Sequence, residues 1–312
     1  MFKSRTVFIL GAGASIPYGF PLGYKLVSDI IDNISLSSKT TVLAKVATEL
    51  QGSVSQFEYE KIQRLRESLL KAVVESIDDF LQARPEFLNV GKAVIAQALI
   101  PYENEARLFA RDNKENWYSM IFEVLRRDIE KLEDRQISFI TFNYDRSLEH
   151  YLFTQLKEYL NLSFDNCKMV MNKIPIIHVY GHIGNLGWQD NKIYRKYEPT
   201  DDVQNILYGM MHLSVIHERN DADENFIEAQ RLIQQSEKVR FLGYGFHDTN
   251  TERLQVAANA KGKDIRATSY GLSKLQRQNI IKYFGNPSYN IPLDKEEKRD
   301  IVRFFKEWTP LE

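Results

Sequence analysis

Four short apolar runs, each ending in a glycine-rich or polar turn, constrain this chain more than any other feature. The runs are rich in β-branched and aromatic residues, which is typical of buried strands. The run and turn pairs are 7–10 into 11–15, 137–142 into 143–145, 174–180 into 181–184 and 239–242 into 243–248. In an open α/β sheet, ligands bind outside the carboxyl ends of the strands. The four turns therefore predict one pocket that is assembled from distant parts of the sequence.

The pattern after residue 137 alternates between strand and helix, which indicates a mostly parallel sheet with helices on both faces. The predicted helices there cover residues 147–160, 224–235, 251–260, 274–284 and 295–308. Between the first two strands, apolar side chains recur at helical spacing over residues 41–134. Pro85 and Pro101 divide this stretch into several helices. We expect one α/β domain over residues 1–312 with a large helical insertion after the first strand.

The composition excludes several classes of protein. The 41 Lys and Arg residues nearly balance the 42 Asp and Glu residues, so we expect no direct binding to nucleic acid. Cys167 is the single cysteine, which excludes an internal disulfide framework and a zinc module of several cysteines. No apolar run approaches the roughly 18 residues of a membrane-spanning helix, and residues 6–10 are too short for a signal peptide core. We predict a cytoplasmic protein that does not contact the membrane.

The first turn has the composition of a phosphate-binding loop. Glycine lets the backbone approach a pyrophosphate, and free amides at a helix start favour anionic oxygens. The candidate ligands of the phosphates are Gly11, Ala12, Gly13, Ala14 and Ser15. The alternative is a glycine-rich turn with a purely structural role. The spacing is not G-x-G-x-x-G, and no acidic residue ends a second strand about 20 residues further on, which disfavours a dehydrogenase.

The second turn carries two polar side chains at the end of a strand, Asn143 and Asp145. An asparagine in this place can hold a ribose hydroxyl or a water molecule. Asp145 is also well placed to cap the helix that begins near Arg146, so its role is either capping or mixed.

The third turn follows a segment that puts His178, Tyr180 and His182 on one side if it stays extended. Histidine titrates near neutrality and is the most frequent general acid or base. The alternative for each histidine is a hydrogen-bonded structural residue. No cysteine lies near and no H-E-x-x-H helix is present, so we expect no metal ion here.

The fourth turn contains Gly243 and Gly245 and is followed by Asn250. It can take the adenosine end of a nucleotide through backbone amides and a ribose contact. The alternative is a glycine turn in which Asp248 caps the next helix.

These motifs, in their order, resemble those of the Sir2-like (sirtuin) superfamily. Residues 11–15 with Gly19-Phe-Pro21 are similar to its G-A-G-x-S…G-x-P loop, which adds Pro21 to the candidate cofactor-binding residues. Residues 142–145 are similar to its asparagine-aspartate motif, and residues 179–183 stand in the place of its L-H-G-S segment. The resemblance spans residues 6 to about 250 and implies a Rossmann-like NAD-binding fold that cleaves the nicotinamide–ribose bond.

Two departures from the sirtuin pattern are informative. Sirtuin deacetylases hold a zinc module with four cysteines, whereas this chain has one cysteine, so it resembles the zinc-free bacterial members of antiphage defence that degrade NAD. The most natural register puts Tyr180 where the family has its histidine. A shift of two residues would use His182 instead, and His178 lies two residues before Tyr180. The implied catalytic residues are Asn143, Asp145 and one of these three.

The resemblance therefore implies an NAD+ glycohydrolase (NADase) that releases nicotinamide and ADP-ribose. Because unchecked activity would drain the cell of NAD, we expect it to stay silent until a regulatory protein encoded alongside it, or homo-oligomer formation, activates it. The alternative from the binding class is an inactive NAD-binding sensor module, which Tyr180 in the histidine position favours. A deacylase and a dehydrogenase are the remaining alternatives.

Overall fold

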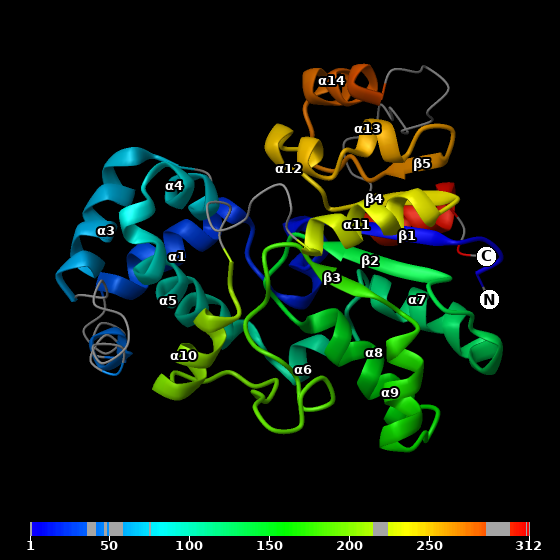
Figure 1. The fold of residues 1–312 in the computed structure, drawn as a ribbon, viewed down its shortest axis with the longest axis horizontal. Coiled ribbons are helices and arrows are strands. Elements are labelled where there is room, and N and C mark those ends of the chain that lie inside the picture. The colour runs from blue at the N-terminus through cyan, green and yellow to red at the C-terminus, as the bar shows by residue number, and fades with distance from the viewer. Residues whose placement is uncertain are drawn as a thin grey trace.

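The computed structural model describes residues 2–35, 42–46, 49, 59–74, 76–214, 224–284, 300–309 and 311. Its described residues form a five-stranded parallel sheet with the strand order β3-β2-β1-β4-β5, flanked by helices (Figure 1). The strands are β1 (Thr6–Leu10), β2 (Ile137–Thr141), β3 (Ile176–His178), β4 (Lys238–Leu242) and β5 (Asp264–Ala267). The predicted Rossmann-like α/β class is confirmed, because this order is that of a doubly wound sheet.

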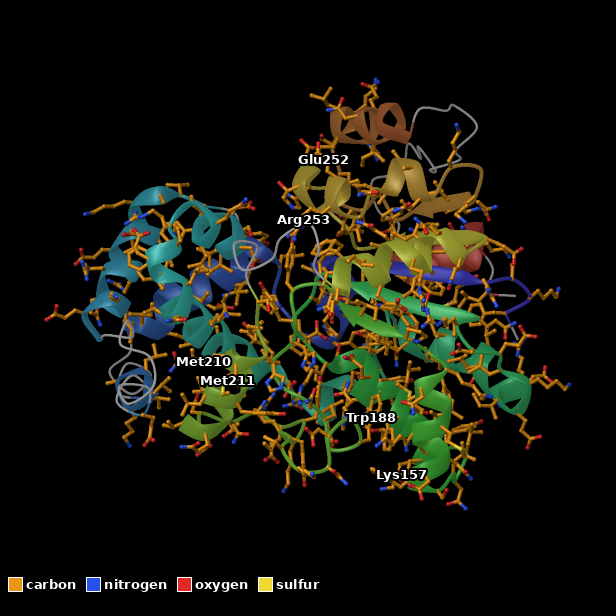
Figure 2. All side chains as sticks on the ribbon, viewed as in Figure 1. Lys157, Trp188, Met210, Met211, Glu252 and Arg253 are labelled. Carbon is orange, nitrogen blue, oxygen red and sulfur yellow. The ribbon has the colours of Figure 1, made fainter. Side chains whose placement is uncertain are left out.

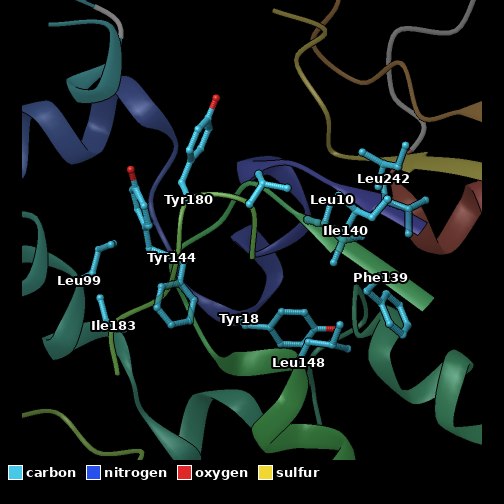
Figure 3. Close-up of a cluster of buried hydrophobic side chains, with 14 of the residues drawn as sticks. Leu10, Tyr18, Leu99, Phe139, Ile140, Tyr144, Leu148, Tyr180, Ile183 and Leu242 are labelled. Carbon is cyan, nitrogen blue, oxygen red and sulfur yellow. The ribbon is translucent and has the colours of Figure 1, made fainter. Parts of the chain in front are cut away.

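The central strands are buried on both faces, as continuous apolar runs in a parallel sheet require. Every residue of β1 and of β2 is buried, and the rings of Phe8 and Phe139 stack across the two strands at 5.3 Å. Figure 3 shows Leu10, Ile140 and Leu242 close together in this core. The chain pairs β2 with one edge of β1 and β4 with the other. The carboxyl ends of β1 and β4 therefore flank the switch point where α/β proteins bind ligands.

The described part of the insertion is helical, and its helices lie in two places. The helices are α1 (Gly23–Ser35), α3 (Tyr59–Ala72), α4 (Ile77–Ala83), α5 (Leu88–Leu99), α6 (Glu105–Leu108) and α7 (Trp117–Leu125). Helices α1, α3, α4 and α5 form a lobe beside the sheet, whereas α7 lies against the sheet (Figure 1). The predicted breaks are confirmed, since 3-10 turns containing Pro85 and Pro101 follow α4 and α5.

The second half of the chain supplies helices to both faces of the sheet and one helix to the lobe. They are α8 (Ser147–Glu158), α9 (Phe164–Asn172), α10 (Val203–Met211), α11 (Glu224–Gln235), α12 (Asp248–Arg253), α13 (Val256–Asn259), α14 (Lys274–Phe284) and α15 (Ile301–Arg303). Helices α7 and α8 lie on one side of the sheet and α11 on the other, while α10 joins the lobe by packing on α5 (Figure 1). In the described ranges, no helix is both long and apolar enough to cross a bilayer.

Several predicted elements differ in extent from the observed ones. The sequence also predicts a strand over residues 265–270. This strand and the predicted strand 174–180 shorten to β5 and β3, because only residues 265–267 and 176–178 of them pair with a neighbour. The predicted helix 251–260 is broken at Gln255, which adopts the left-handed conformation with a φ of 49°. The predicted helix 295–308 is described only from residue 300, as α15 and a π-helical turn (Phe304–Trp308). Helices α9 and α10 were not predicted.

Candidate functional site

The four predicted turns converge at the carboxyl edge of the sheet. The Nδ2 of Asn143 donates to the carbonyl oxygen of Gly11 over 3.0 Å, which joins the second turn to the first. The amide of Gly13 donates to the carbonyl of Gly243 over 3.1 Å, which joins the first turn to the fourth. His178, at the end of β3, lies with its Nδ1 2.8 Å from the carbonyl oxygen of Asn143. The amide of Ile183 donates to the carbonyl of Tyr144 over 3.0 Å, which joins the third turn to the second. The four turns therefore lie next to one another, and the pocket between them stays a prediction.

The glycines of the first and fourth turns pack backbone against backbone. A Cβ atom on Gly11 would lie 2.6 Å from the carbonyl oxygen of Gly243, and one on Gly13 would lie 2.8 Å from the Cα of Gly243. Gly243 has a φ of 56°, and a Cβ there would lie 2.2 Å from the amide nitrogen of Ala14. The structure thus gives these three glycines a packing role: each makes room for the opposite turn.

The first turn is a pair of 3-10 turns (Ala12–Ala14 and Ile16–Tyr18) rather than the start of a helix, and α1 begins only at Gly23, after the half-buried Pro21. The amides of four of the five candidate residues already donate to main-chain carbonyls; they belong to Gly11, Gly13, Ala14 and Ser15. Of these five amides, that of Ala12 is the one without an acceptor among the described residues. If the backbone of residues 11–15 binds an anion, the donor would therefore be the amide of Ala12.

Asn143 is half-buried and has one free hydrogen-bonding atom. Its Nδ2 donates to the Gly11 carbonyl and also, over 2.9 Å, to the hydroxyl of Ser15. Because a carbonyl oxygen can only accept, these bonds fix which end of the amide faces Gly11. In the part of the chain that the structure describes, the Oδ1 of Asn143 has no donor. This oxygen can accept a hydrogen bond from a water molecule or a sugar hydroxyl.

Asp145 is buried and both of its carboxyl oxygens are engaged. Oδ2 accepts from the hydroxyl of Ser15 over 2.7 Å, and Oδ1 accepts from the amide of Ser147 over 3.1 Å and from its hydroxyl. Burial raises the pKa of the Asp145 carboxyl, although the bonds from Ser147 and Ser15 oppose this rise. Asp145 thus caps the first turn of α8 and supports Ser15, which in turn accepts from Asn143.

His178 is buried and its two ring nitrogens are both bonded to acceptors. Nε2 lies 2.5 Å from the Oε1 of Glu149 on α8, and Nδ1 bonds to the Asn143 carbonyl. Burial disfavours charge on both partners, but their mutual attraction and hydrogen bond raise the pKa of His178 and lower the pKa of Glu149. The pair is therefore a buried imidazolium carboxylate. Glu149 was not predicted; the available signal was its place in the first turn of the helix predicted from residue 147, close to Asp145 in the sequence.

His182 is half-buried and keeps one nitrogen free. Its Nδ1 lies 2.9 Å from the carbonyl oxygen of Gly184 and must carry the proton, since that oxygen only accepts. Among the described residues, none bonds to Nε2. Burial and the nearby charge of His178, whose ring centroid is 5.1 Å away, lower the pKa of His182 to about 3. At neutral pH, His182 is thus an uncharged imidazole with a free lone pair.

Tyr180 is buried and belongs to an aromatic cluster. Its ring packs edge-on against Phe142 at 5.8 Å, and its hydroxyl donates to the Oδ1 of Asn250 over 2.6 Å and accepts from Arg253. Burial raises the pKa of Tyr180 to about 12. Tyr180 therefore links the third turn to α12, where Figure 2 labels Arg253, and it engages the side chain of the candidate Asn250. Gly245 is exposed in the turn before α12.

A buried cluster of charges holds the loop that follows His182. Glu103 accepts from Nε and Nη2 of Arg146 over 2.8 and 2.7 Å, and also from Arg195. Arg146 Nη1 donates to the carbonyl oxygens of Gly184 and Asn185 over 3.1 and 2.9 Å. The polar sequence of residues 184–202 predicts a loop, and the structure has no helix or strand there. Arg146 holds this loop through bonds to its main-chain carbonyls. The carbonyl oxygen of Gly184 thus accepts hydrogen bonds from both Arg146 and His182.

A groove of about 730 Å³ lies apart from the four turns, along α8 and the loop after Gly184. Phe153 and Trp188 stack in its wall at 5.3 Å, and Figure 2 labels Trp188 and Lys157 on this side. In the described ranges, no three His, Cys, Asp or Glu side chains are grouped to hold a metal ion. Comparison of the sequence with models of known protein families found no match, and comparison with curated proteins found none.

Proposed function

We propose that this chain is an NAD+ glycohydrolase, which cleaves the bond between nicotinamide and ribose and releases nicotinamide and ADP-ribose. The observation that carries the proposal is that His178, at the carboxyl edge of a doubly wound sheet, bonds to the carbonyl of Asn143 and lies with its ring 5.1 Å from that of His182. Among the described residues, the Oδ1 of Asn143 and the Nε2 of His182 have no partner. The ordered motifs that resemble those of the sirtuin superfamily support the substrate.

The proposed reaction needs one water and one base. The bond from the anomeric carbon to the ring nitrogen breaks, its electron pair leaves with neutral nicotinamide, and the sugar passes through an oxocarbenium-like state. A water oxygen then bonds to the anomeric carbon and loses a proton to the Nε2 of His182. The Oδ1 of Asn143 accepts a hydrogen bond from this water or from a ribose hydroxyl and so orients it.

The remaining candidates take supporting roles in this proposal. The Ala12 amide would donate to a phosphate oxygen, while Pro21, Gly245 and Asn250 would border the dinucleotide. Asp145 would act through Ser15, because both of its oxygens are already bonded. His178, which has no free nitrogen, and Tyr180, whose hydroxyl is engaged, are not proposed as bases.

We also propose that the enzyme acts in bacterial antiphage defence, by depleting cytoplasmic NAD once a partner or self-assembly activates it. The resemblance to zinc-free members of the superfamily supports this setting. The chemistry supports it too, since continuous cleavage of NAD+ would harm the cell that makes the enzyme.

The proposal is tested by incubating the purified full chain with NAD+, alone, at high protein concentration and with candidate partner proteins. Nicotinamide and ADP-ribose should appear in equal amounts under at least one of these conditions. His182→Ala should abolish this release, whereas His150→Ala, which removes a histidine bonded to Glu105 instead, should not. NAD+ binding without nicotinamide release under every condition would instead support the sensor module, which the engaged hydroxyl of Tyr180 favours.

The pH dependence of the reaction should reflect the lowered pKa of His182. A base acts in its unprotonated form, and a pKa of about 3 keeps His182 unprotonated well below neutrality. We therefore expect kcat to stay constant between about pH 5 and pH 8, the range in which an ordinary histidine changes charge. Initial rates of nicotinamide release at saturating NAD+ measure this. A rate that falls with protonation near the ordinary histidine pKa of about 6.5 would contradict the assignment.

A further inference from the structure

We propose that Glu149 and His178 are positioning residues, which hold the main chain of Asn143 in the conformation that the reaction needs. This inference rests on the proposed function, and it adds a residue, Glu149, that the motifs do not contain. Neither side chain would touch the substrate. Each would act through Asn143.

The hydrogen bonds around Asn143 carry the inference. Its amide nitrogen donates to the hydroxyl of Thr141 over 3.0 Å, and its Nδ2 donates to the Gly11 carbonyl. Its carbonyl oxygen accepts from His178, which Glu149 holds from the other side. The residue is thus fixed at its amide, its side-chain nitrogen and its carbonyl, and only Oδ1 remains for a ligand.

The carbonyl of Asn143 lies where the sheet no longer supplies a donor. The ladder between β2 and β3 ends at the Thr141 carbonyl, which accepts from the amide of Val179 over 3.0 Å. Beyond that point, the carbonyl of Asn143 accepts from the imidazolium of His178 instead of from a backbone amide. A side chain can be replaced without altering the sheet, so this contact can be tested by substitution.

The chemistry of the pair also points to a purpose beyond packing. Glu149 and His178 are both buried, and burying two charges costs solvation energy that apolar side chains of the same volume would not lose. The ring of His178 also lies 5.1 Å from the ring of His182. The cation of His178 therefore also disfavours a second positive charge on His182, which keeps the Nε2 of His182 unprotonated and able to accept a hydrogen bond at neutral pH.

The experiment compares Glu149→Ala with Glu149→Gln in the full chain under the condition that activates the wild type. Alanine removes the partner of His178. We expect kcat to fall roughly 10- to 100-fold, the loss typical when a residue that orients a metal ligand is replaced, with little change in KM. Glutamine keeps a hydrogen-bonding group of the same length, because its amide can donate to the Nε2 of a neutral His178 while Nδ1 still bonds to Asn143. It should restore most of the lost kcat.

Two further variants keep the test decisive. Glu149→Met preserves the side-chain volume without hydrogen-bonding oxygens, so it replaces the alanine variant if that chain does not fold. Asp264→Ala removes the partner of the buried Arg240 at the β4–β5 edge, and it should lower stability but leave kcat unchanged. Melting temperatures measured beside the rates separate loss of fold from loss of positioning.

Each outcome decides between the two proposals. Wild-type kcat in Glu149→Ala or Glu149→Met, in a chain whose wild type is active, would overturn the positioning role alone. An equal fall of kcat in the glutamine and alanine variants would also overturn it, because charge and not hydrogen bonding would then matter. A wild-type chain that releases no nicotinamide under any condition would overturn the proposed function and this inference together.

Discussion

Replacing Asn143 with alanine is expected to lower kcat/KM for NAD+ cleavage by about 100- to 1,000-fold, the loss typical of removing one preorganised polar group at a reacting centre. The substitution removes the only hydrogen-bonding atom at this residue that the described fold leaves free, its Oδ1. It also frees the hydroxyl of Ser15 and the carbonyl of Gly11 from their shared donor. Nicotinamide release by the activated full chain measures the effect.

The control for this substitution is Asn172→Ala, which changes an exposed asparagine at the end of α9. It should leave kcat/KM unchanged. Circular dichroism and the melting temperature of both variants should stay near those of the wild type. Wild-type rates in a folded Asn143→Ala chain would refute the role given to Asn143, and with it the observation on which the proposed function depends.

Replacing Glu103 with alanine is expected to lower the free energy of unfolding by about 3–5 kcal/mol, the range measured when one partner of a buried ion pair is removed. The reason is that Arg146 and Arg195 would both remain in the core, where their side chains are 0% and 1% exposed, without their shared carboxylate. Chemical denaturation at equilibrium measures the change. The loop after His182 should also become more sensitive to protease, because Arg146 holds the carbonyls of Gly184 and Asn185.

Glu86→Ala is the matched control, since Glu86 pairs with Arg84 on the surface, where both side chains are about half exposed. Surface pairs contribute little, so this variant should stay within about 0.5 kcal/mol of the wild type. A loss below about 1 kcal/mol in Glu103→Ala would show that the two guanidinium groups find other partners.

The sheet and the place of the candidate site could be predicted because buried parallel strands leave a strong trace in sequence. Strands β1 and β2 are nearly continuous apolar runs, and the turn that follows each of them is polar or glycine-rich. Helices α9 and α10 could not be predicted by periodicity, since each has nine residues and buries only two side chains larger than glycine. Their available signals were the capping residues, Ser163 and Asp202, whose side chains accept from the first turn of each helix.

The partners within the site were beyond prediction because they depend on three-dimensional approach. Glu149 meets His178 across 29 positions, and Glu103 meets Arg195 across 92, with no motif connecting either pair. The letters of the first turn were also ambiguous. The sequence gives the positions of the glycines. It does not show whether a backbone amide is available to a ligand or, like that of Gly13, already donates to the neighbouring turn.

The tight fit between the first and fourth turns determines which variants can serve as catalytically dead controls in cells. A substitution at Gly11, Gly13 or Gly243 inserts an atom between two main chains, so a phenotype there reports on assembly of the protein rather than on turnover. Genetic screens that recover such alleles would misplace the active residues. An informative knockout must instead change a side chain whose end is unengaged, as at His182.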